Sequence, residues 1–332
     1  MTDARLDVLC IGNAIVDVIA ATEDAFLQRE GLDKGSMRLI DAEEAARLYD
    51  HMGPAREISG GSAGNTAAGI AMLGGRAGFV GQVADDQLGD VYFHDINSIG
   101  VEFATPRSPQ AEAPTARSLV LVTPDAERTM NTFLGAAQNL TVDQLDEDQV
   151  RAAAVTYLEG YLWDPEQPRA AMERAIEVAH AAGRQIAFTL SDGFCVSRHR
   201  DGFLGLIEGG KVDILFANED EILSLTGAGD FDTAVAQVRP KVPVLVVTRS
   251  EKGAIACRGD EKVQVAAEPV ARVVDTTGAG DLFAAGFLTG YTQGRSLHDS
   301  LRMGAIAAAE VISHYGARPE ADLKALVAEK LG

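Results

Sequence analysis

A regular alternation of short apolar runs with longer amphipathic stretches constrains the fold of this chain more than any other feature. Between residues 154 and 250, the strand-length runs AVTYLEGY, RQIAFTL, VDILFAN and VPVLVVTRS are separated by stretches with helical periodicity. Buried apolar strands that alternate with helices are typical of a parallel sheet covered on both faces. The alternation therefore predicts a three-layer α/β/α fold with a mainly parallel central sheet.

Two segments fit such a core poorly. Residues 15–60 carry the short polar pieces GSMRLID and AREISGG, and residues 101–133 carry ARSLVLVTPDAERTMNTF, which predicts a hairpin with a Pro-Asp turn. We expect these segments to form a small β-sheet lid, inserted in a core made of residues 1–14, 61–100 and 134–332. Three helices are expected to end the chain, at about 280–293, 296–312 and 319–330.

The charge balance argues against two classes of partner. The chain has 49 acidic residues against 29 basic ones, and a net charge of −20 at pH 7 repels nucleic acid and anionic lipid. No apolar run is long enough to span a membrane, and the first residues lack the cationic region of a signal peptide. We therefore expect a cytoplasmic protein with no nucleic-acid and no membrane partner.

The cysteines predict neither a disulfide framework nor a zinc site. Cys10, Cys195 and Cys257 lie far apart in the sequence and are odd in number. No CxxC pair and no Cys/His ligand spacing occurs. We expect three buried free thiols.

The common nucleotide-binding motifs are missing. The P-loop pattern GxxxxGK[ST] does not occur, and the first strand runs into CIGNAIVD without a GxGxxG. The first absence excludes a P-loop protein, and the second argues against an NAD-linked dehydrogenase in spite of the α/β pattern.

The stretch DTTGAGDLFAAGF, which begins at Asp275, offers another way to hold an anion. Gly278, Ala279 and Gly280 let backbone N–H groups approach an oxyanion closely, and a helix start adds positive potential. Asp281 would repel a bound phosphate, so its useful role is to accept a proton from a hydroxyl that attacks the phosphate. The alternative is that Asp281 only caps its helix, which is a common use of aspartate.

Three motifs resemble the signatures of the ribokinase-like, or PfkB-type, carbohydrate kinases. They are GGSAGNTAAGIAMLG at 60–74, NEDE at 218–221 and DTTGAGDLFAAGF, and they follow one another in the order of that family. The resemblance implies the family's fold, a central sheet with flanking helices and a small β lid. It also implies phosphoryl transfer from ATP, with Asp281 as the catalytic base and Gly278 to Gly280 as the anion hole.

The resemblance also implies where ATP and its metal bind. Asn218 and Glu221 of NEDE would position Mg²⁺–ATP, largely through water, as suits a cation that keeps several waters. The alternative for NEDE is a capped, solvated helix start. Thr248 and Gly253 in VVTRSEKGAIA, with Thr276, would contact ATP. Arg249 and Glu251 stand where the family usually has small residues.

Further implied sites lie in the lid and near the carboxyl terminus. Arg128 resembles an arginine that reaches the phosphates, although a solvated hairpin charge is the alternative. Asp275 and the segment SHYGAR at 313–318 resemble a monovalent-cation loop, which implies potassium. Lid sheets of this family sometimes pair between chains, so we expect either a monomer or a homodimer that pairs through the lid.

The acceptor pocket decides the substrate. In GNAIVD, Asn13 and Asp17 are expected to straddle the end of the first strand, and an aspartate can accept hydrogen bonds from two vicinal hydroxyls of a ribose. A carboxylate buried without a partner between the apolar runs AIV and VIA would cost free energy, which favours a functional role for Asp17. The pattern GNxxxD resembles the adenosine-kinase branch of the family. Gly61, Ser62 and Asn65 would complete the sugar site.

A nucleoside also needs an apolar slot for its base. Side chains just after a core strand and on the lid are candidates for this slot, although each is more often plain core: Tyr161, Leu162, Trp163, Leu39, Ile40 and Phe133. The leading hypothesis is therefore transfer of the γ-phosphoryl group of ATP to the 5′-hydroxyl of adenosine.

Three alternatives to this hypothesis stay open. The first is another kinase of the family, acting on ribose, fructose, 2-keto-3-deoxygluconate, inosine or guanosine. A catalytically silent nucleotide sensor is the second, and the intact Asp281 argues against it. The third, an NAD-linked dehydrogenase, lacks its fingerprint.

Overall fold

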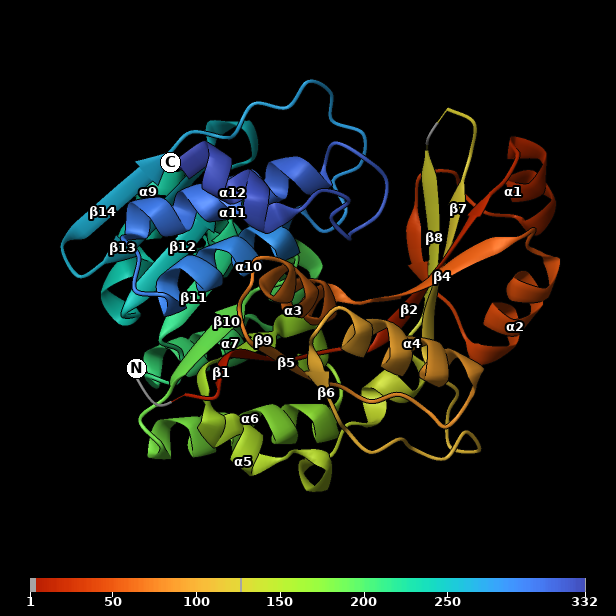
Figure 1. The fold of residues 1–332 in the computed structure, drawn as a ribbon, viewed down its shortest axis with the longest axis horizontal. Coiled ribbons are helices and arrows are strands. Elements are labelled where there is room, and N and C mark those ends of the chain that lie inside the picture. The colour runs from red at the N-terminus through yellow and green to blue at the C-terminus, as the bar shows by residue number, and fades with distance from the viewer. Residues whose placement is uncertain (1–3, 126, 332) are drawn as a thin grey trace.

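Two β-sheets, one large and one small, organise the chain (Figure 1). The computed structural model describes residues 4–125 and 127–331. The large sheet has the strand order β14-β13-β12-β11-β10-β9-β1-β5-β6, and it is parallel except where β12, β13 and β14 pair antiparallel at one edge. Its strands are β1 (Leu6–Ile11), β5 (Ala77–Val80), β6 (Glu102–Phe103), β9 (Ala153–Glu159), β10 (Gln185–Thr189), β11 (Ile214–Asn218), β12 (Val244–Thr248), β13 (Ala254–Arg258) and β14 (Glu261–Val265).

Helices cover both faces of the large sheet, as the alternation predicted. Successive side chains of a strand point to opposite faces, so Val8 and Cys10 of β1 pack in one apolar cluster and Leu9 and Ile11 in the other. The first cluster includes residues of α3 (Ser62–Met72), α4 (Gln87–Ser98), α10 (Ala279–Thr292), α11 (Leu297–Val311) and α12 (Leu323–Leu331). The second includes residues of α5 (Glu147–Ala152), α6 (Glu166–Ala181), α7 (Gly193–Glu208), α8 (Glu219–Thr226) and α9 (Phe231–Val238).

Within residues 4–125 and 127–331, five short 3₁₀ helices complete the core connections. They are η1 (Gly135–Asn139), η2 (Val142–Gln144), η3 (Gly160–Trp163), η4 (Arg239–Lys241) and η5 (Ser250–Lys252). Two of them, η3 and η5, directly follow the carboxyl ends of strands β9 and β12, where ligands of an α/β sheet usually bind.

The small sheet stands beside the core, on the right of Figure 1. Its strand order is β3-β8-β7-β2-β4. The strands are β2 (Ile15–Ala21), β3 (Met37–Leu39), β4 (Ala55–Gly60), β7 (Ala116–Val122) and β8 (Arg128–Phe133), and the helices α1 (Asp24–Glu30) and α2 (Ala42–His51) lie among them in the sequence. Strands β7 and β8 form the antiparallel hairpin that the sequence predicts. The boundaries of the lid domain stay a prediction.

The register of the small sheet separates two faces. Val16, Val18 and Leu119 share one face and pack in the same apolar cluster as Leu27 of α1 and Leu48 of α2. Asp17 is opposite Ser118, and both therefore point to the other face. We call this second face the cleft face, because it carries the acid that the sequence assigns to the acceptor.

The last three helices differ from the prediction at one boundary. Helix α12 begins at Leu323 rather than near residue 319, because the segment before it forms a loop. The carboxylate of Glu310 accepts hydrogen bonds from the backbone N–H groups of Glu320 and Ala321, at 3.0 and 2.8 Å, and holds these residues outside a helix. This loop, residues 312–322, returns to the predicted site.

Two expectations from composition can be compared with the structure. Cys10, Cys195 and Cys257 are buried and free, as expected. Among the described residues, no helix has both the length and the apolar character that a membrane span requires.

Candidate active site

Helix α10 begins at a glycine turn that no other residue could replace without strain. Gly278 is the N-cap residue and has a left-handed backbone, with φ 79° and ψ −2°. A Cβ atom at Gly278 would also lie 2.8 Å from the Cβ of Ala317. The first N–H groups of an α-helix lack acceptors within the helix, and no side chain caps α10. The turn therefore presents backbone N–H groups with a positive potential.

Asp281 lies in the first turn of α10, but it does not cap that helix. Its Oδ1 atom accepts a hydrogen bond from Ser62 Oγ at 2.6 Å, and its Oδ2 atom accepts one from Asn65 Nδ2 at 2.9 Å. Both partners belong to α3, and Thr66 of that helix donates to the backbone oxygen of Asp281 at 3.2 Å. The interpretation of Asp281 as a simple cap is therefore wrong.

The surroundings of Asp281 favour a base. Burial raises the pKa of Asp281 above its ordinary value, while the hydrogen bonds from Ser62 and Asn65 and the charge of Arg318 act in the opposite direction. A carboxylate with a raised pKa is a stronger proton acceptor than an exposed aspartate. The group is still held as an acceptor, because both of its oxygens receive hydrogen bonds.

The buried glutamate Glu159, which the sequence analysis missed, joins the predicted residue Asn13 to the first turn of α3. Glu159 ends strand β9, and its Oε1 atom accepts hydrogen bonds from Asn13 N and Nδ2 at 2.7 and 2.9 Å. Its Oε2 atom accepts one from Ala63 N at 2.8 Å, in the first turn of α3. Burial raises the pKa of Glu159 to about 7. An acid at the end of the wholly buried strand AAVTYLE was the signal in the sequence.

Asp17 lies on lid strand β2, so Asn13 and Asp17 both follow the first strand and do not straddle its end as expected. Asn13 lies in the turn between β1 and β2, and Asp17 lies inside β2, because the chain leaves the large sheet at Ile11 and pairs with β7 and β4. The Asp17 carboxylate is packed so closely on Gly60 that a Cβ there would lie 2.4 Å from Oδ2. Burial raises the pKa of Asp17 to about 6, and Arg318 and Arg128 oppose the rise. Gly61, with φ 82°, is the N-cap of α3.

Two of the predicted aromatic slot residues point elsewhere. Trp163 is buried and packs against Phe188 and Phe203, with ring centroids 6.4 and 6.0 Å away, in the cluster under α6 and α7. Phe133 is opposite Arg117, whose guanidinium lies over Tyr49 of α2. Phe133 is therefore on the helix-covered face of the lid. Apolar character predicts burial, but the face depends on strand register.

Of the four remaining slot residues, two are buried in the core and two are at least partly exposed. Leu162 and Ile40 are buried core residues. Tyr161 is half-buried in η3, and its hydroxyl donates to the backbone oxygen of Ser191 at 3.3 Å. Leu39 is 63% exposed and is opposite Thr132, which pairs with Ser118 on the cleft face. Leu39 and Tyr161 thus remain available to a ligand.

The NEDE segment forms a capping box at the start of α8. Asn218 Oδ1 accepts a hydrogen bond from Glu221 N at 2.8 Å, while Glu221 accepts from Asn218 N and Nδ2 at 2.9 and 2.7 Å. Burial raises the pKa of Glu221 to about 7, and the charges of Asp192 and Asp220 add to the rise. A nearby cation would relieve this repulsion.

The geometry at NEDE therefore suits a metal that is contacted through water. Among the residues that the structure describes, no group of three or more His, Cys, Asp or Glu side chains could hold a metal ion. Mg²⁺ commonly uses only one or two protein carboxylates and keeps several waters, so Asn218 and Glu221 fit an indirect role.

The predicted nucleotide contacts lie beside this helix start. Thr248 ends β12 directly opposite Asn218 in the parallel register. Gly253 has φ 89°, and a Cβ there would lie 2.0 Å from the backbone oxygen of Val265, so only glycine fits. Arg249 pairs with Glu219 at 3.0 Å and lies 3.7 Å from the ring centroid of Phe231. Arg249 is thus held in place by Glu219 and Phe231.

An ion pair connects the lid to the core. Arg128 Nη1 at the start of β8 lies 2.8 Å from Asp275 Oδ2, and both side chains are nearly buried. Asp275 also accepts hydrogen bonds from Thr277 N, Thr277 Oγ1 and Gly316 N, at 3.0, 2.7 and 2.9 Å. The guanidinium of Arg128 lies over the ring of Tyr315, 5.6 Å from its centroid. In this structure the cation beside Asp275 is therefore an arginine. Thr276, the residue between Asp275 and Thr277, lies in this same loop.

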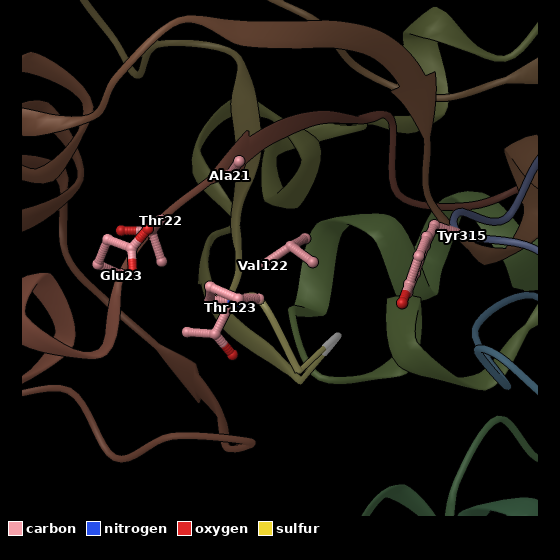
Figure 2. A pocket seen from close by; sticks show the side chains of 7 residues that line it. Ala21, Thr22, Glu23, Val122, Thr123 and Tyr315 are labelled. Carbon is pink, nitrogen blue, oxygen red and sulfur yellow. The ribbon is translucent and has the colours of Figure 1, made fainter.

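A cavity of about 370 Å³ opens next to this ion pair (Figure 2). Figure 2 shows Tyr315 on one side of it and Val122 and Thr123 of the lid across from it. The ends of β2 and β7 supply the rest of its lining, which is Ala21, Thr22, Glu23 and Pro124. Tyr315, in the predicted cation-loop segment 313–318, lines this cavity, but none of the residues assigned to catalysis, the acceptor or ATP does, so the cavity is not the catalytic centre.

Comparisons with known proteins agree with this geometry. A model of the pfkB family of carbohydrate kinases matches residues 5–323. The chain is similar to a curated adenosine kinase of Saccharomyces cerevisiae, with 28% identity over 328 residues that cover 92% of this chain and 94% of that protein.

Solved structures give higher similarity. One described as an adenosine kinase from Sinorhizobium meliloti has 51% identity and a TM-score of 0.90, covering 99% of this chain and 100% of that one. Another, described as a probable sugar kinase from Rhizobium etli, has 50% identity and a TM-score of 0.90, covering 98% and 99%.

Proposed function

Because the chain belongs to the pfkB family of carbohydrate kinases, and is thus a phosphotransferase with an alcohol group as acceptor, we propose that it transfers the γ-phosphoryl group of ATP to the 5′-hydroxyl of adenosine. One observation carries the catalytic part of this proposal. Asp281 stands beside the glycine turn of α10, yet its carboxylate is held by Ser62 and Asn65 of another helix. This arrangement supports a role for Asp281 as a base rather than as a cap.

The proposed chemistry uses two groups at this turn, the backbone N–H groups and the carboxylate of Asp281. The N–H groups at Gly278 to Gly280 stabilise charge on the transferred phosphoryl group, and Asp281 accepts the proton of the attacking hydroxyl. Phosphoryl transfer needs mainly alignment and charge stabilisation. The lid adds the exclusion of water, so that ATP is not lost to hydrolysis.

ATP and Mg²⁺ are proposed to bind over the carboxyl ends of β11 and β12. Asn218 and Glu221 would contact the metal through water, with Thr248, Gly253 and Thr276 beside the nucleotide. Bound Mg²⁺ neutralises negative charge on the phosphates. Arg128 is proposed to contact a phosphate, because its Nε and Nη2 atoms are buried and have no hydrogen-bond partner.

Adenosine is proposed as the acceptor on three supports. The Asp17 carboxylate packs on Gly60 and the Asn13 backbone packs on Gly61, directly before α3. These groups suit the hydroxyls of a ribose, completed by Gly61, Ser62 and Asn65. Leu39 on the cleft face of the lid and Tyr161 after β9 offer apolar surface for a base. The third support is the 51% identity to a structure described as an adenosine kinase.

A sugar is the second candidate acceptor, because a structure with 50% identity is described as a probable sugar kinase. Turnover decides between the candidates. ADP release would be measured with ATP and Mg²⁺ across adenosine, inosine, guanosine, ribose, fructose and 2-keto-3-deoxygluconate. We expect adenosine to be turned over well above the others. Turnover of a sugar with none of adenosine would overturn the acceptor and keep the base.

Three finer points stay predictions. Potassium activation would work through Asp275, and ADP release with and without K⁺ tests it. A homodimer would pair through the lid, and the mass in solution distinguishes it from a monomer. A cytoplasmic location is supported by the three buried free thiols, which suit a reducing compartment.

A further inference from the structure

Arg318 connects three parts of the site from a single position. It lies in the loop after α11, and its Nε and Nη2 atoms donate to the backbone oxygen of Ser59 at 3.1 and 2.6 Å. Nη2 also donates to Ser59 Oγ at 2.8 Å, and Nη1 donates to the backbone oxygen of Gly64 at 3.0 Å. Ser59 lies in lid strand β4 and Gly64 in the first turn of α3.

The two contacts of Arg318 lie next to the residues that hold the reacting groups. Gly64 stands between Ser62 and Asn65, which donate to the two oxygens of Asp281. Ser59 immediately precedes Gly60, against which the Asp17 carboxylate packs. Ser59 is itself fixed by Asp95 of α4, which accepts from Ser59 N at 2.8 Å and from Ser59 Oγ at 2.6 Å. One guanidinium thus joins lid strand β4 to helix α3, which orients the base.

The charge of Arg318 has a second effect. Titratable groups from several elements surround Asp281, and they are Cys10 on β1, Asp17 on β2, Tyr157 and Glu159 on β9, Tyr161 in η3 and Arg318. Arg318 acts to lower the pKa of both Asp17 and Asp281, whereas Arg128 acts in this way on Asp17. An opposite charge favours the ionised form of a carboxyl group.

We propose that Arg318 is a positioning residue for phosphoryl transfer, which sets the geometry of the first turn of α3 and supplies positive charge to the acids Asp17 and Asp281. The proposal rests on the proposed role of Asp281 as base. It does not require that the acceptor is adenosine.

The test separates charge from geometry with two variants. Arg318→Gln removes the charge and most of the fork of donors. Arg318→Lys keeps the charge, but a single ammonium cannot reproduce the planar fork that reaches Ser59 and Gly64 together. Arg239→Gln is the matched control, because Arg239 also donates twice to one backbone oxygen, that of Gly259, at 2.8 and 2.6 Å. Arg239 lies in η4, away from the site.

The first readout is the titration of Asp281, followed by ¹³C-carboxyl NMR and assigned with Asp281→Asn. In Arg318→Gln we expect the Asp281 midpoint to rise by roughly one pH unit. In Arg318→Lys and Arg239→Gln it should stay at the wild-type value. No acceptor is needed, so this result stands even if adenosine is not a substrate.

The second readout is kcat with whichever acceptor the wild-type protein turns over. Both Arg318 variants should lose on the order of 10- to 100-fold, because small displacements of a reacting group are costly, while Arg239→Gln keeps its rate. An unchanged Asp281 midpoint in Arg318→Gln would overturn the proposal, even if the rate fell, since that would show structural support alone. If Arg318→Gln does not fold, a wild-type rate in Arg318→Lys overturns it.

Discussion

Helices α8 and α10 both start with an acid in the first turn, and they use that acid in opposite ways. Glu221 of α8 is bound to Asn218, three residues away, in a capping box. Asp281 of α10 is bound to Ser62 and Asn65, which are 219 and 216 residues away in the sequence. Burial raises the pKa of both acids, so the difference lies in their partners.

The difference shows what frees an acid for chemistry. In α8, the glutamate satisfies its own helix start, so its carboxylate is bound by local groups. In α10, a glycine supplies the turn and the acid caps nothing, so the N–H groups of the turn are not taken by the Asp281 side chain. A distant helix then orients the carboxylate, and this separates the anion site from the base.

The largest expected effect is that of Asp281→Asn. Loss of the base should lower kcat by about 10²–10⁴-fold, while ATP affinity measured by calorimetry stays close to wild type. Burial raises the pKa of Asp281, so removing its charge should not lower the free energy of unfolding at neutral pH. Glu221→Gln is the matched variant, with kcat at saturating Mg²⁺–ATP within about 10-fold of wild type. If Asp281→Asn kept more than a tenth of the wild-type kcat, the contrast between Asp281 and Glu221 would not hold.

The second effect concerns the stability of α8. The pKa of Glu221 is raised from 4.5 to about 7, so its contribution to stability is present below about pH 4.5 and is lost as the pH rises through 7. Glu221→Gln keeps a capping residue and cannot ionise. Between about pH 5 and pH 8, its free energy of unfolding should fall by roughly 2 kcal/mol less than that of wild type. Urea unfolding at both pH values measures this, and identical falls would refute it.

The third effect sharpens the role of the distant partners of Asp281. Ser62→Ala removes a hydrogen bond that lowers the pKa of Asp281, so that pKa should rise. The base must be ionised to work, so the acid limb of the kcat profile should move to higher pH. At pH 7, we expect a loss of roughly 10-fold. Ser98→Ala, at an exposed hydroxyl that donates to Asp95 O, is the control, and an unmoved acid limb in Ser62→Ala would contradict the prediction.

The smallest effect tests the cap of α8 directly. Asn218→Ala removes the side chain that accepts from Glu221 N, and it should cost about 1 kcal/mol of unfolding free energy. Asp281→Ala should not remove a capping contribution to the unfolding free energy of α10, because the Asp281 side chain caps no N–H group of that helix. Thermal or urea unfolding of the two variants compares them. An equal loss of unfolding free energy in the two variants would mean that Asp281 also acts as a cap.

Much of the fold could be predicted from residue order. Apolar strand-length runs predicted the parallel core, because strands buried on both faces need apolar side chains throughout. Polar alternation predicted the extended pieces that form β3 and β4, and the Pro-Asp turn predicted the hairpin of β7 and β8. The start of α12 could not be predicted in the same way, because Glu310 binds two N–H groups that lie ten and eleven residues further along.

The site was predictable to a different degree. The motifs identified Asp281 and its glycine turn, and the structure places Ser62 and Asn65 on the carboxylate. Trp163 and Phe133 were assigned to the base slot, and they face a core cluster and the lid helices instead. Glu159 carried no motif, and Arg318 was noted only as the last residue of SHYGAR, because each acts mainly through backbone groups of distant segments.

The sequence by itself determined whatever depends on neighbours within a few residues. The capping box of Asn218 and Glu221, the glycine turn at Gly278 and the identity of each strand follow from local spacing and backbone preference. Tertiary structure decided which face a side chain reaches, which acids meet, and that Arg128 and Arg318 bind partners on other elements. The physical reason is that a hydrogen bond or ion pair between distant segments depends on strand pairing and helix packing, which bring together groups that no local pattern relates.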